Sequence, residues 1–360
     1  MHYLPRACKL KASPWAIVLI DEDRLKGPIT QVLQLLRLLV VRMVGSQHPK
    51  VRTNTFSGAL MNTKTSNLTN VRTSNLDKRA GLNWNTTIFM VIFHLGAVAS
   101  LFMLSWKVVP ITILLWWISG SLGIGMGFHR LLTHRGYKTP KAVEYFLTFC
   151  GLLALEGGAI NWVVTHRIHH ANTDASGDPH TPRDGRWWSH MGWILRGTSQ
   201  QHDDSVMQRY APDLMKDPGH LWLNRLYFVP LILSGIGLLA IGGWSMMFVG
   251  VFLRVTVGLH FTWLVNSATH LWGTRRFETK DDSTNSWWVA LLSFGEGWHN
   301  NHHAHPRAAK HGLTWYEIDF NWYGIRALQL FGLAKGIRLI SQQQIAAAAN
   351  AQFGELKKAA

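Results

Sequence analysis

The sequence predicts an all-α integral membrane protein in which four transmembrane helices carry long helical segments on the cytosolic side. The chain of 360 residues is 47% hydrophobic and 16% charged, whereas soluble proteins carry about 25% charged residues. Four apolar runs have the length of about 20 residues that a bilayer requires. Many of the 18 tryptophans lie near the ends of these runs, as interfacial aromatic residues do.

The four apolar runs form two closely spaced pairs, at residues 86–106 and 108–128 and at residues 226–244 and 245–265. The fourth run is the least apolar because it contains Arg254 and His260, and polar residues at that depth must face protein or a cavity. A further apolar stretch at 143–160 is interrupted by Glu156 and three glycines. We expect it to form a helix that lies on the membrane face or dips into it.

The charge distribution predicts the orientation of the chain. The 36 Lys and Arg exceed the 20 Asp and Glu, and the net charge is +16. Such a charge attracts anionic lipid, an acidic protein or nucleic acid, but the basic residues flank the apolar runs instead of forming one stripe, so we expect no nucleic acid. From the first run onward, nearly all Lys and Arg lie in 129–225 and 266–360. The positive-inside rule therefore places both segments and both termini in the cytosol.

The two ends of the chain differ in composition from the centre. Residues 1–80 form a basic N-terminal extension that we expect to be disordered, because its second half is rich in Ser, Thr and Asn. Its apolar stretch "ITQVLQLLRLLVV" is too short to span a bilayer and is typical of an amphipathic surface helix. The membrane domain is expected at 81–345, followed by a flexible tail at 346–360. With only Cys8 and Cys150, we expect no disulfide framework.

The motifs that carry chemistry are four groups of histidines, all at cytosolic ends of runs or in cytosolic segments. They are "HRLLTH" with His129 and His134, "HRIHH" with His166, His169 and His170, "NSATH" with His270 four residues after Asn266, and "HNNHH" with His299, His302 and His303. Residues i, i+3 and i+4 share one face of a helix, so we expect each triplet to point toward one centre. His129 and His134 lie about 140° apart on an α-helix and are expected to serve different metals.

Nine imidazoles are too many for one ion, since zinc takes four ligands and octahedral metals take six. The sequence therefore predicts two metal ions, with open positions for water or dioxygen. Imidazole suits zinc, copper, nickel and iron, so the residues alone leave the metal open. His180 in "GDPHTP" and His305 in "HHAHP" are candidates to hydrogen-bond the second ring nitrogen of the ligands.

A family resemblance extends from about residue 84 to 340. The segments "GMGFHRLLTHRGYKTP", "THRIHHANTDASGDPHTPRDG", "HMGWIL", "NSATHLWGTRRF" and "GEGWHNNHHAHP" resemble the membrane fatty acyl desaturases, specifically the acyl-CoA Δ9 (stearoyl-CoA) desaturase group. The resemblance implies two irons bound by the nine histidines, with Asn266 holding a water on one iron. It also implies four transmembrane helices beneath a cytosolic helical cap that holds this diiron site.

The resemblance further implies substrates and partners. The family's reaction uses O2 and two external electrons to place a cis double bond, most often Δ9, in a saturated C16 or C18 chain. Acyl-CoA is the implied substrate, and an acyl-lipid is the alternative. The sequence has no HPGG haem motif, so the electron donor is expected to be a separate ferredoxin or cytochrome b5, attracted by the basic cytosolic face.

Three residues are candidates to bind the acyl chain. The methylene groups of an acyl chain are chemically alike, so the position of the acyl chain must be set by the shape of a tunnel. Ile113 or Trp117, in the second apolar run, is expected to close that tunnel; the alternative is that both face lipid. Trp162 lies four residues before His166 on the same helical face and is expected to line the channel, with ordinary core packing as the alternative.

Two other functions fit parts of the pattern. A related membrane diiron hydroxylase or ketolase would share the histidine motifs but differ in their spacing and surroundings. A metal transporter or sensor would use histidine clusters without catalysis, but a transporter places its ligands near mid-membrane in broken helices. Here the clusters lie at the cytosolic ends of the runs, which disfavours a transporter.

The first prediction concerns the N-terminal extension. Deleting residues 1–75 should leave desaturation intact, because the histidine motifs and all four apolar runs lie beyond it. The measurement is the fatty-acid profile of cells that express the truncated chain, compared with the full chain at equal protein level. Loss of activity on truncation would show that the extension belongs to the functional domain.

Overall fold

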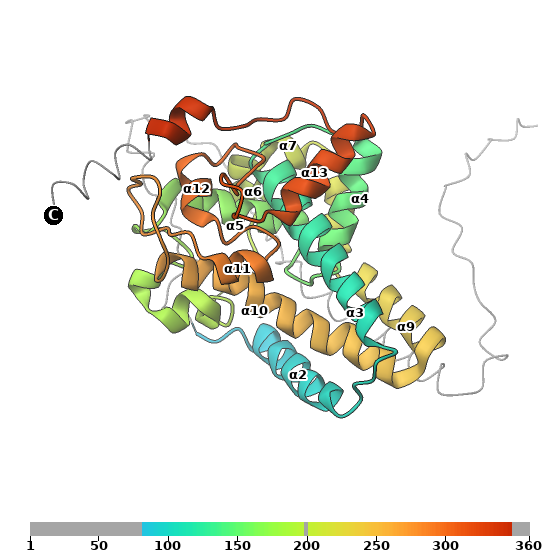
Figure 1. The fold of residues 1–360 in the computed structure, drawn as a ribbon. Helices are drawn as coiled ribbons and strands as arrows, with labels where there is room; N and C mark the ends of the chain where they lie inside the picture. The colour runs from blue at the N-terminus through green and yellow to red at the C-terminus, as the bar shows by residue number, and fades with distance from the viewer. Residues whose placement is uncertain (1–80, 198–200, 348–360) are drawn as a thin grey trace, which may run out of the picture. The chain divides into compact units, whose positions relative to one another are not determined.

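The computed structural model describes residues 81–197 and 201–347, and within these two ranges the chain is built from helices, with isolated bridges in place of strands (Figure 1). The all-α prediction is thus confirmed for these residues, which all belong to one compact unit, residues 69–360. The predicted extension at 1–80 and the tail from 348 onward lie outside the described residues.

The helices are, in chain order, α2 (Trp84–Leu101), α3 (Val109–Trp116), η3 (Trp117–Thr133), α4 (Lys141–Leu152), α5 (Ala159–Asn172), η4 (Pro182–Asp184), η5 (Trp188–Gly192), α6 (Asp204–Tyr210), α7 (Pro212–Met215), α8 (Pro218–Arg225), α9 (Val229–Met247), η6 (Phe248–Leu253), α10 (Arg254–Ser267), η7 (Ala268–His270), α11 (Trp287–Leu292), α12 (His299–Ala304) and α13 (Phe320–Leu330). The segments η3, η5 and η6 are π-helices, and η4 and η7 are 3₁₀ turns.

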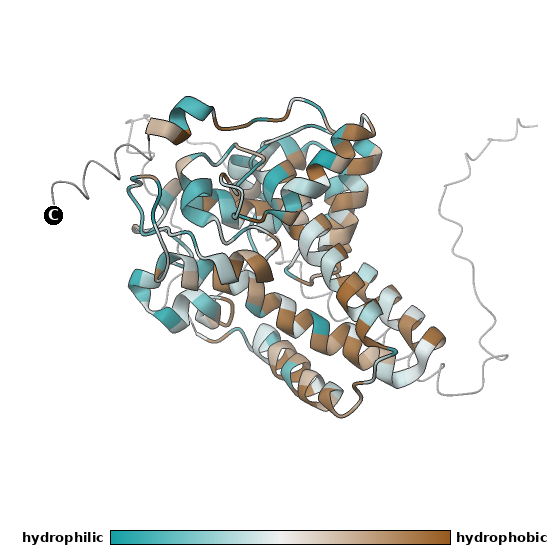
Figure 2. Ribbon diagram, viewed as in Figure 1, coloured by the Kyte–Doolittle hydropathy of each residue, from teal (hydrophilic) through white to brown (hydrophobic). Residues whose placement is uncertain are grey.

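Within the described ranges, three helices are long and apolar enough, by length and composition, to cross a membrane. They are Trp84–Leu101, Val109–Thr133 and Val229–His270. Figure 2 shows apolar residues concentrated along α2, α3, α9 and α10, which form these helices. Local sequence sets where they begin: the Asn83 side chain accepts a hydrogen bond from the Thr86 amide at the start of α2, and a proline lies in the first turn of α3 and of α9.

The third apolar helix contains both of the last two predicted runs. It has 42 residues, or about 63 Å of helix, roughly twice the thickness of a bilayer core. Its backbone leaves helical geometry at Gly242 and at Gly243, where φ is +67°. After this break the chain turns back on itself, because a Cβ at Gly250 would lie 2.7 Å from Leu238. The halves before and after the break therefore lie side by side.

Hydrogen bonds and glycine contacts fix the neighbouring helices. Ser100 in α2 donates to the Phe248 carbonyl at 2.9 Å, and Thr256 in α10 donates to the Phe93 carbonyl at 3.1 Å. The helix predicted within 143–160 is present as α4 and packs on η3 at a glycine contact. There, a Cβ on Gly123 would lie 2.3 Å from the backbone nitrogen of Gly151.

This glycine contact generates a stability prediction. Gly123→Ala should destabilise the protein by about 1–3 kcal/mol, because the new methyl group meets backbone that has no room to move. The matched control is Gly237→Ala in α9, where a Cβ meets nothing within 4 Å and the loss of glycine flexibility should be neutral or stabilising. Thermal unfolding in detergent measures both variants. Equal melting temperatures would contradict the close contact between η3 and α4.

Candidate metal centre

The nine predicted histidines meet in two buried or half-buried groups. In each group the candidate ligand atoms lie within 4.8 Å of one another. The five-histidine group contains His129, His134, His166, His170 and His302. The four-histidine group contains His169, His270, His299 and His303. Segments far apart in the sequence supply both groups, and α5 and α12 each contribute to both.

The prediction that each triplet points toward one centre is wrong. On α5, His166 and His170 join the five-histidine group, and the intervening His169 joins the other group. On α12 the division is reversed, because His299 and His303 stay together and His302 leaves them. On an α-helix, i+3 lies about 60° to one side of residue i and i+4 about 40° to the other side. Each triplet therefore spans both groups.

The prediction that His129 and His134 serve different metals is also wrong, since both belong to the five-histidine group. The reason is the π-helix η3, which the sequence periodicity did not reveal. In a π-helix the backbone bond runs between i and i+5, and here the His134 amide donates to the His129 carbonyl at 3.1 Å. Residues five apart are thereby stacked on one face, and their rings lie 4.8 Å apart.

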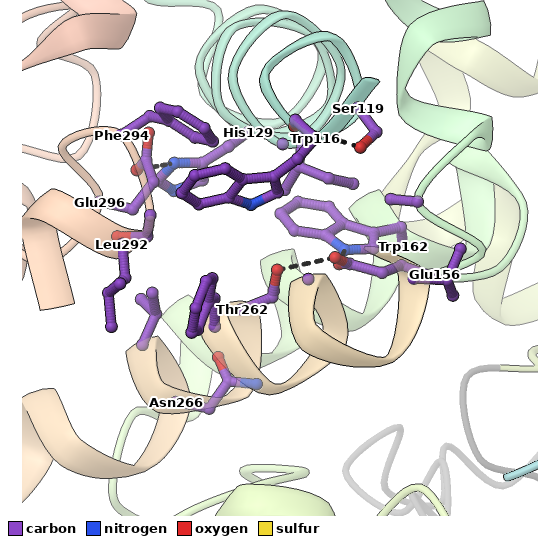
Figure 3. Close-up of a pocket in the computed structure, with 18 of the residues that line it drawn as sticks. Trp116, Ser119, His129, Glu156, Trp162, Thr262, Asn266, Leu292, Phe294 and Glu296 are labelled. Carbon is purple, nitrogen blue, oxygen red and sulfur yellow. Dashed lines mark hydrogen bonds and ion pairs between the residues drawn. The ribbon is translucent and has the colours of Figure 1, made fainter. Parts of the chain in front are cut away.

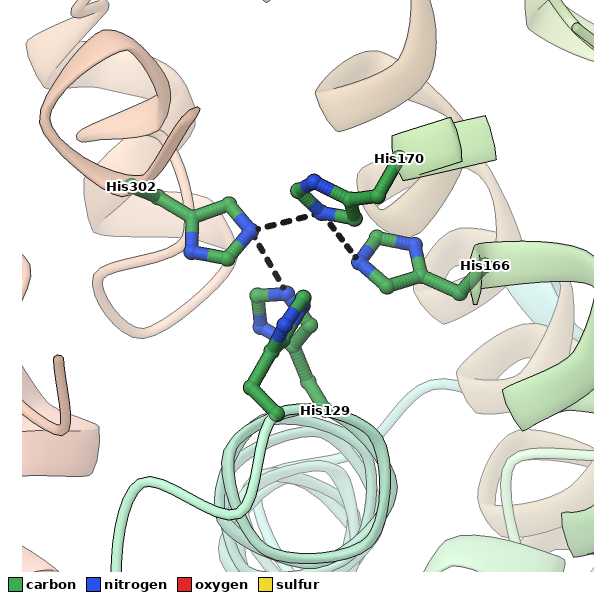
Figure 4. Close-up of side chains that lie close together, drawn as sticks. His129, His166, His170 and His302 are labelled. Atoms are coloured by element: carbon green, nitrogen blue, oxygen red, sulfur yellow. Dashed lines mark hydrogen bonds between the residues drawn. The ribbon is translucent and has the colours of Figure 1, made fainter. Parts of the chain in front are cut away.

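The facing nitrogens of the five-histidine group have the spacing of metal ligands. Figure 4 shows the Nε2 atoms of His129, His166, His170 and His302 converging. His302 Nε2 lies 3.1 Å from that of His129 and 3.0 Å from that of His170, and His170 Nε2 lies 3.1 Å from that of His166. Two nitrogens bound at right angles to one metal at about 2.1 Å lie about 3.0 Å apart. The residues therefore fit a metal ion.

In four of the nine histidines, a carboxylate lies against the ring nitrogen Nδ1. The sequence analysis did not identify any of these four carboxylates. Each carboxylate faces Nδ1: Glu296 at His129 (2.6 Å), Asp178 at His169 (3.0 Å), Asp174 at His270 (2.8 Å) and Asp281 at His303 (3.2 Å). A carboxylate accepts the Nδ1 proton and leaves the Nε2 lone pair for a metal. Consistently, the Nε2 atoms of the last three rings are buried without a hydrogen-bond partner among the described residues.

The predicted partners His180 and His305 have other positions. The His180 ring is buried 4.4 Å from the His169 ring, but Asp178 is the group that bonds His169. His305 packs on Phe277 at 4.9 Å and belongs to neither histidine group. The motif "GDPH" therefore does contain the hydrogen-bond partner of His169, but that partner is Asp178 and not the predicted His180.

Most histidines of the site are in the neutral form that binds a metal. Burial, reinforced by neighbouring imidazoles, holds the pKa values of six rings well below the usual range, so these rings are neutral at pH 7. They are His134, His166, His170, His299, His302 and His303. Burial also lowers the pKa of His169, but Asp178, Asp174 and Asp281 together raise this pKa above its usual value. A metal at His169 would displace that proton.

A buried network ties His129 to the C-terminal part of the chain. Glu296 accepts from the Arg130 guanidinium at 3.0 Å and from Asn321 at 2.7 Å, while its other oxygen faces His129. Arg130 also donates to Asp319 at 3.0 Å. Burial opposes ionisation of Glu296, but Arg130 and the nearby imidazoles lower its pKa well below the usual range. The carboxylate is therefore charged and holds His129 in place.

Strained backbone accompanies the site. Four non-glycine residues in the described ranges have positive φ: Arg135, Leu155, Asp174 and Phe294, at +53° to +58°. Arg135 follows a group histidine, Asp174 bonds His270, and Phe294 lies two residues before Glu296. Non-glycine residues in this region cost about 1–3 kcal/mol and cluster at functional sites.

An apolar pocket opens beside the histidines (Figure 3). His129 and His166 of the five-histidine group and His299 of the four-histidine group line it, together with Asn266. Its empty space is about 700 Å³, counting the part open to the surroundings. The other lining residues are mostly apolar or aromatic and include Trp116, Ile124, Val255, Phe261, Val265, Leu292 and Phe294.

The predicted chain-binding residues divide between this pocket and the exterior. Trp162 lines the pocket, and its ring stacks on His166 at 5.1 Å. Ile113 and Trp117 are 54% and 40% exposed and do not line the pocket, so their positions favour the lipid-facing alternative. Trp116 lies in the pocket wall instead. The sequence could not separate these neighbours, because the chain passes from α-helix to π-helix at this point.

Fold and site together define a helical membrane protein with a histidine-rich candidate metal centre. The family model for fatty acid desaturases matches residues 104–332. An sn-1 stearoyl-lipid 9-desaturase of Anabaena variabilis is 48% identical over 265 residues, which cover 73% of this chain and 96% of that protein. An sn-2 palmitoyl-lipid 9-desaturase of Nostoc sp. (strain 36) is 45% identical, with coverage of 71% and 90%. An acyl-CoA C20 Delta5-desaturase of Anemone leveillei is 40% identical, with coverage of 72% and 84%.

The chain therefore belongs to the fatty acid desaturase family, which confirms the resemblance seen in its histidine motifs. It is an oxidoreductase of the desaturase type. The histidine groups are compatible with a metal site in such an enzyme.

The carboxylate partners generate a prediction about metal binding. Asp178→Asn should lower metal affinity by about 10–100-fold, because the amide no longer fixes the Nδ1 proton of His169. Asp203→Asn is the control, since Asp203 belongs to neither histidine group and its side chain bonds Ser205 and the Val206 amide at the start of α6, where asparagine caps equally well. Metal content after dialysis against a graded chelator series measures both. Equal retention in the two variants would show that Asp178 does not support the site.

Proposed function

We propose that this desaturase places a cis double bond at Δ9 of saturated C16 and C18 acyl chains. The observation that carries the proposal is one apolar pocket lined by histidines of both groups. Relatives that share 48% and 45% identity are named for 9-desaturation of stearoyl- and palmitoyl-lipids, which supports the position and the chain lengths. An apolar, water-poor pocket suits a substrate whose reacting groups are methylenes.

We propose two iron ions as the cofactor, held by the nine histidines, with Asn266 holding a water beside one of them. Five converging nitrogens exceed the four ligands of a zinc site, and imidazole also suits iron. When bound, the metal pair would supply the activation of dioxygen that removal of hydrogen from an unactivated CH₂ group requires.

The protein's own residues position the chain and exclude water. Trp162 lines the pocket beside His166, and its indole nitrogen donates to Glu156 at 2.9 Å, which fixes the ring. Thr262 donates to the same carboxylate at 2.7 Å from α10. These two bonds join Thr262 of α10 to Glu156 and Trp162 on the facing wall and fix the shape of the pocket beside the histidines. The acyl chain would be held by this shape, because its methylene groups make no polar contacts.

The relatives change the proposed head group of the substrate. The sequence resemblance favours acyl-CoA, but the two relatives at 48% and 45% identity are named acyl-lipid desaturases, and the acyl-CoA relative shares 40%. We therefore propose acyl chains of membrane lipids as the substrate and keep acyl-CoA as the second candidate. Adding labelled acyl-CoA or labelled phospholipid to isolated membranes separates the two.

The proposed topology has four transmembrane spans in two hairpins, with both termini and the metal centre in the cytosol. The break at Gly242 and Gly243 would form the turn of the second hairpin, and the distribution of Lys and Arg supports the orientation. We assign desaturation to residues 81–345. A separate ferredoxin or cytochrome b5 would deliver the two electrons to the basic cytosolic face.

The direct test is expression in a desaturase-deficient host together with each candidate donor, followed by mass spectrometry that locates the double bond. We expect C16 and C18 chains with a cis bond at Δ9. Hydroxylated or ketone products would instead identify a related membrane diiron hydroxylase or ketolase. Unchanged lipids with a working donor would reject the proposal.

Filling the apolar pocket should slow the reaction. Gly258 lines the pocket, and a Cβ there meets nothing within 4 Å. Gly258→Leu should therefore fill the pocket without disturbing the backbone and lower kcat/KM for C18 chains by at least about tenfold. Gly237→Leu is the matched control, because its Cβ also points into open space but lies outside this pocket. An unchanged rate in Gly258→Leu, with protein and metal levels equal to wild type, would place the acyl chain elsewhere.

A further inference from the structure

A buried carboxyl group lies where the apolar pocket meets a second, smaller pocket. Glu156 is 6% exposed and lines both. Its two oxygens accept hydrogen bonds from Thr262 and from the Trp162 indole (Figure 3). The Thr262 hydroxyl can rotate and accept a hydrogen bond from a protonated Glu156, whereas the indole N–H can only donate. This arrangement can therefore accommodate Glu156 either as a carboxylate or as a carboxylic acid.

Glu156 has no cationic partner within hydrogen-bond distance among the described residues. The titratable or charged groups that face the two pockets with it are His129, His166, His180, Arg254, Glu296 and His299. Arg254 is engaged by the Gly250 carbonyl and by Ser119, and Glu296 is held by Arg130. Burial raises the pKa of Glu156 to about 7, and the bonds from Thr262 and Trp162 offset the rise only in part.

The second pocket leads from Glu156 toward the surface. Thr165 lines it, and the Thr165 hydroxyl lies 2.8 Å from His202 Nε2. The His202 ring is half-buried, and Gln201 and Asp203 on either side of it are exposed. Hydroxyl and imidazole groups both donate and accept protons. A polar route therefore runs from the surface through His202 and Thr165 to the second pocket, and Glu156 stands at its inner end.

The proposed reaction consumes protons at a buried place. An acyl segment –CH₂–CH₂– plus O₂, two electrons and two protons gives –CH=CH– and two waters. Dioxygen gains four electrons, two from the acyl chain and two from the one-electron donor protein. The two protons must come from solvent, although the apolar pocket excludes it.

We propose that Glu156 is the acid that gives these protons to dioxygen-derived oxygen, and that His202 and Thr165 recharge it. This inference rests on the proposed desaturation. In each transfer the O–H bond of the Glu156 carboxyl breaks and an O–H bond of product water forms. The carboxylate then takes a proton from the second pocket, so each turnover uses the carboxyl twice.

The decisive variant is Glu156→Gln. The amide keeps both contacts, since its oxygen accepts from Trp162 and its NH₂ donates to Thr262, but it cannot release a proton at neutral pH. We expect at least about a tenfold lower rate, with metal content and double-bond position unchanged. The wild-type rate should fall as pH rises through about 7, because only the acid form of Glu156 donates a proton. This decrease of rate with pH (the pH limb) should be absent in the variant. Glu156→Asp should restore part of the rate and of the limb.

The route has its own matched pair of variants. Thr165→Val removes the hydroxyl that faces His202, and Thr148→Val removes an equally buried hydroxyl that bonds only within its own helix. We expect slower turnover in Thr165→Val alone, with metal content equal in both. Equal rates in the two variants would overturn the route.

Infrared spectroscopy of metal-free protein tests the carboxyl without turnover. Wild type should show a protonated-carboxyl C=O band that disappears between about pH 5 and pH 9, and Glu156→Gln should lack it. Absence of the band, or an unchanged rate and pH limb in Glu156→Gln, would overturn this inference. Loss of metal or a shifted double bond in that variant would also overturn it, because Glu156 would then be a positioning residue. Failure of wild type to desaturate any acyl chain would instead reject the proposed function.

Discussion

Nine imidazole rings occupy one buried region, and in the five-histidine group nitrogens face each other at 3.0–3.1 Å. Lone pairs at that distance repel unless a proton or a cation lies between them. A carboxylate faces Nδ1 at His129, His169, His270 and His303, and burial keeps the other five rings neutral. A metal cation bound among these nitrogens would relieve the repulsion, and the surrounding fold keeps the nitrogens facing one another.

Several features of the fold keep the imidazole nitrogens facing one another. The π-helix η3 stacks His129 and His134, which an α-helix would separate. The α5 and α12 triplets each reach both groups, so two helices hold both candidate metal positions at a fixed separation. Glycine contacts bring α4 close to η3, and the Arg130–Glu296 network anchors His129 from the opposite side. The apolar pocket then lies directly against the histidines; the proposed acyl substrate would be held there by shape, because its methylene groups offer no polar contact.

The sequence predicted the helical class, the apolar runs and all nine histidines, because hydropathy and motif spacing are local properties. It did not predict how the histidines divide, since that depends on the π-helix and on how α5 faces α12. The four supporting carboxylates were visible in "NTDASGDPH", "KDDST" and "GEGWH", but their pairing with particular rings depends on loops that spacing rules do not describe. The sequence left two alternatives for Ile113 and Trp117, and their exposed positions outside the pocket favour the lipid-facing one; the change from α-helix to π-helix next to them is not visible in the sequence.

The nine histidines are proposed to form one site for two metal ions. Metal content of the purified full-length protein, combined with anomalous scattering at the iron edge, tests this directly. We expect about two irons per chain, one within each histidine group. A single zinc ion, or less than about one iron per chain in active protein, would contradict it.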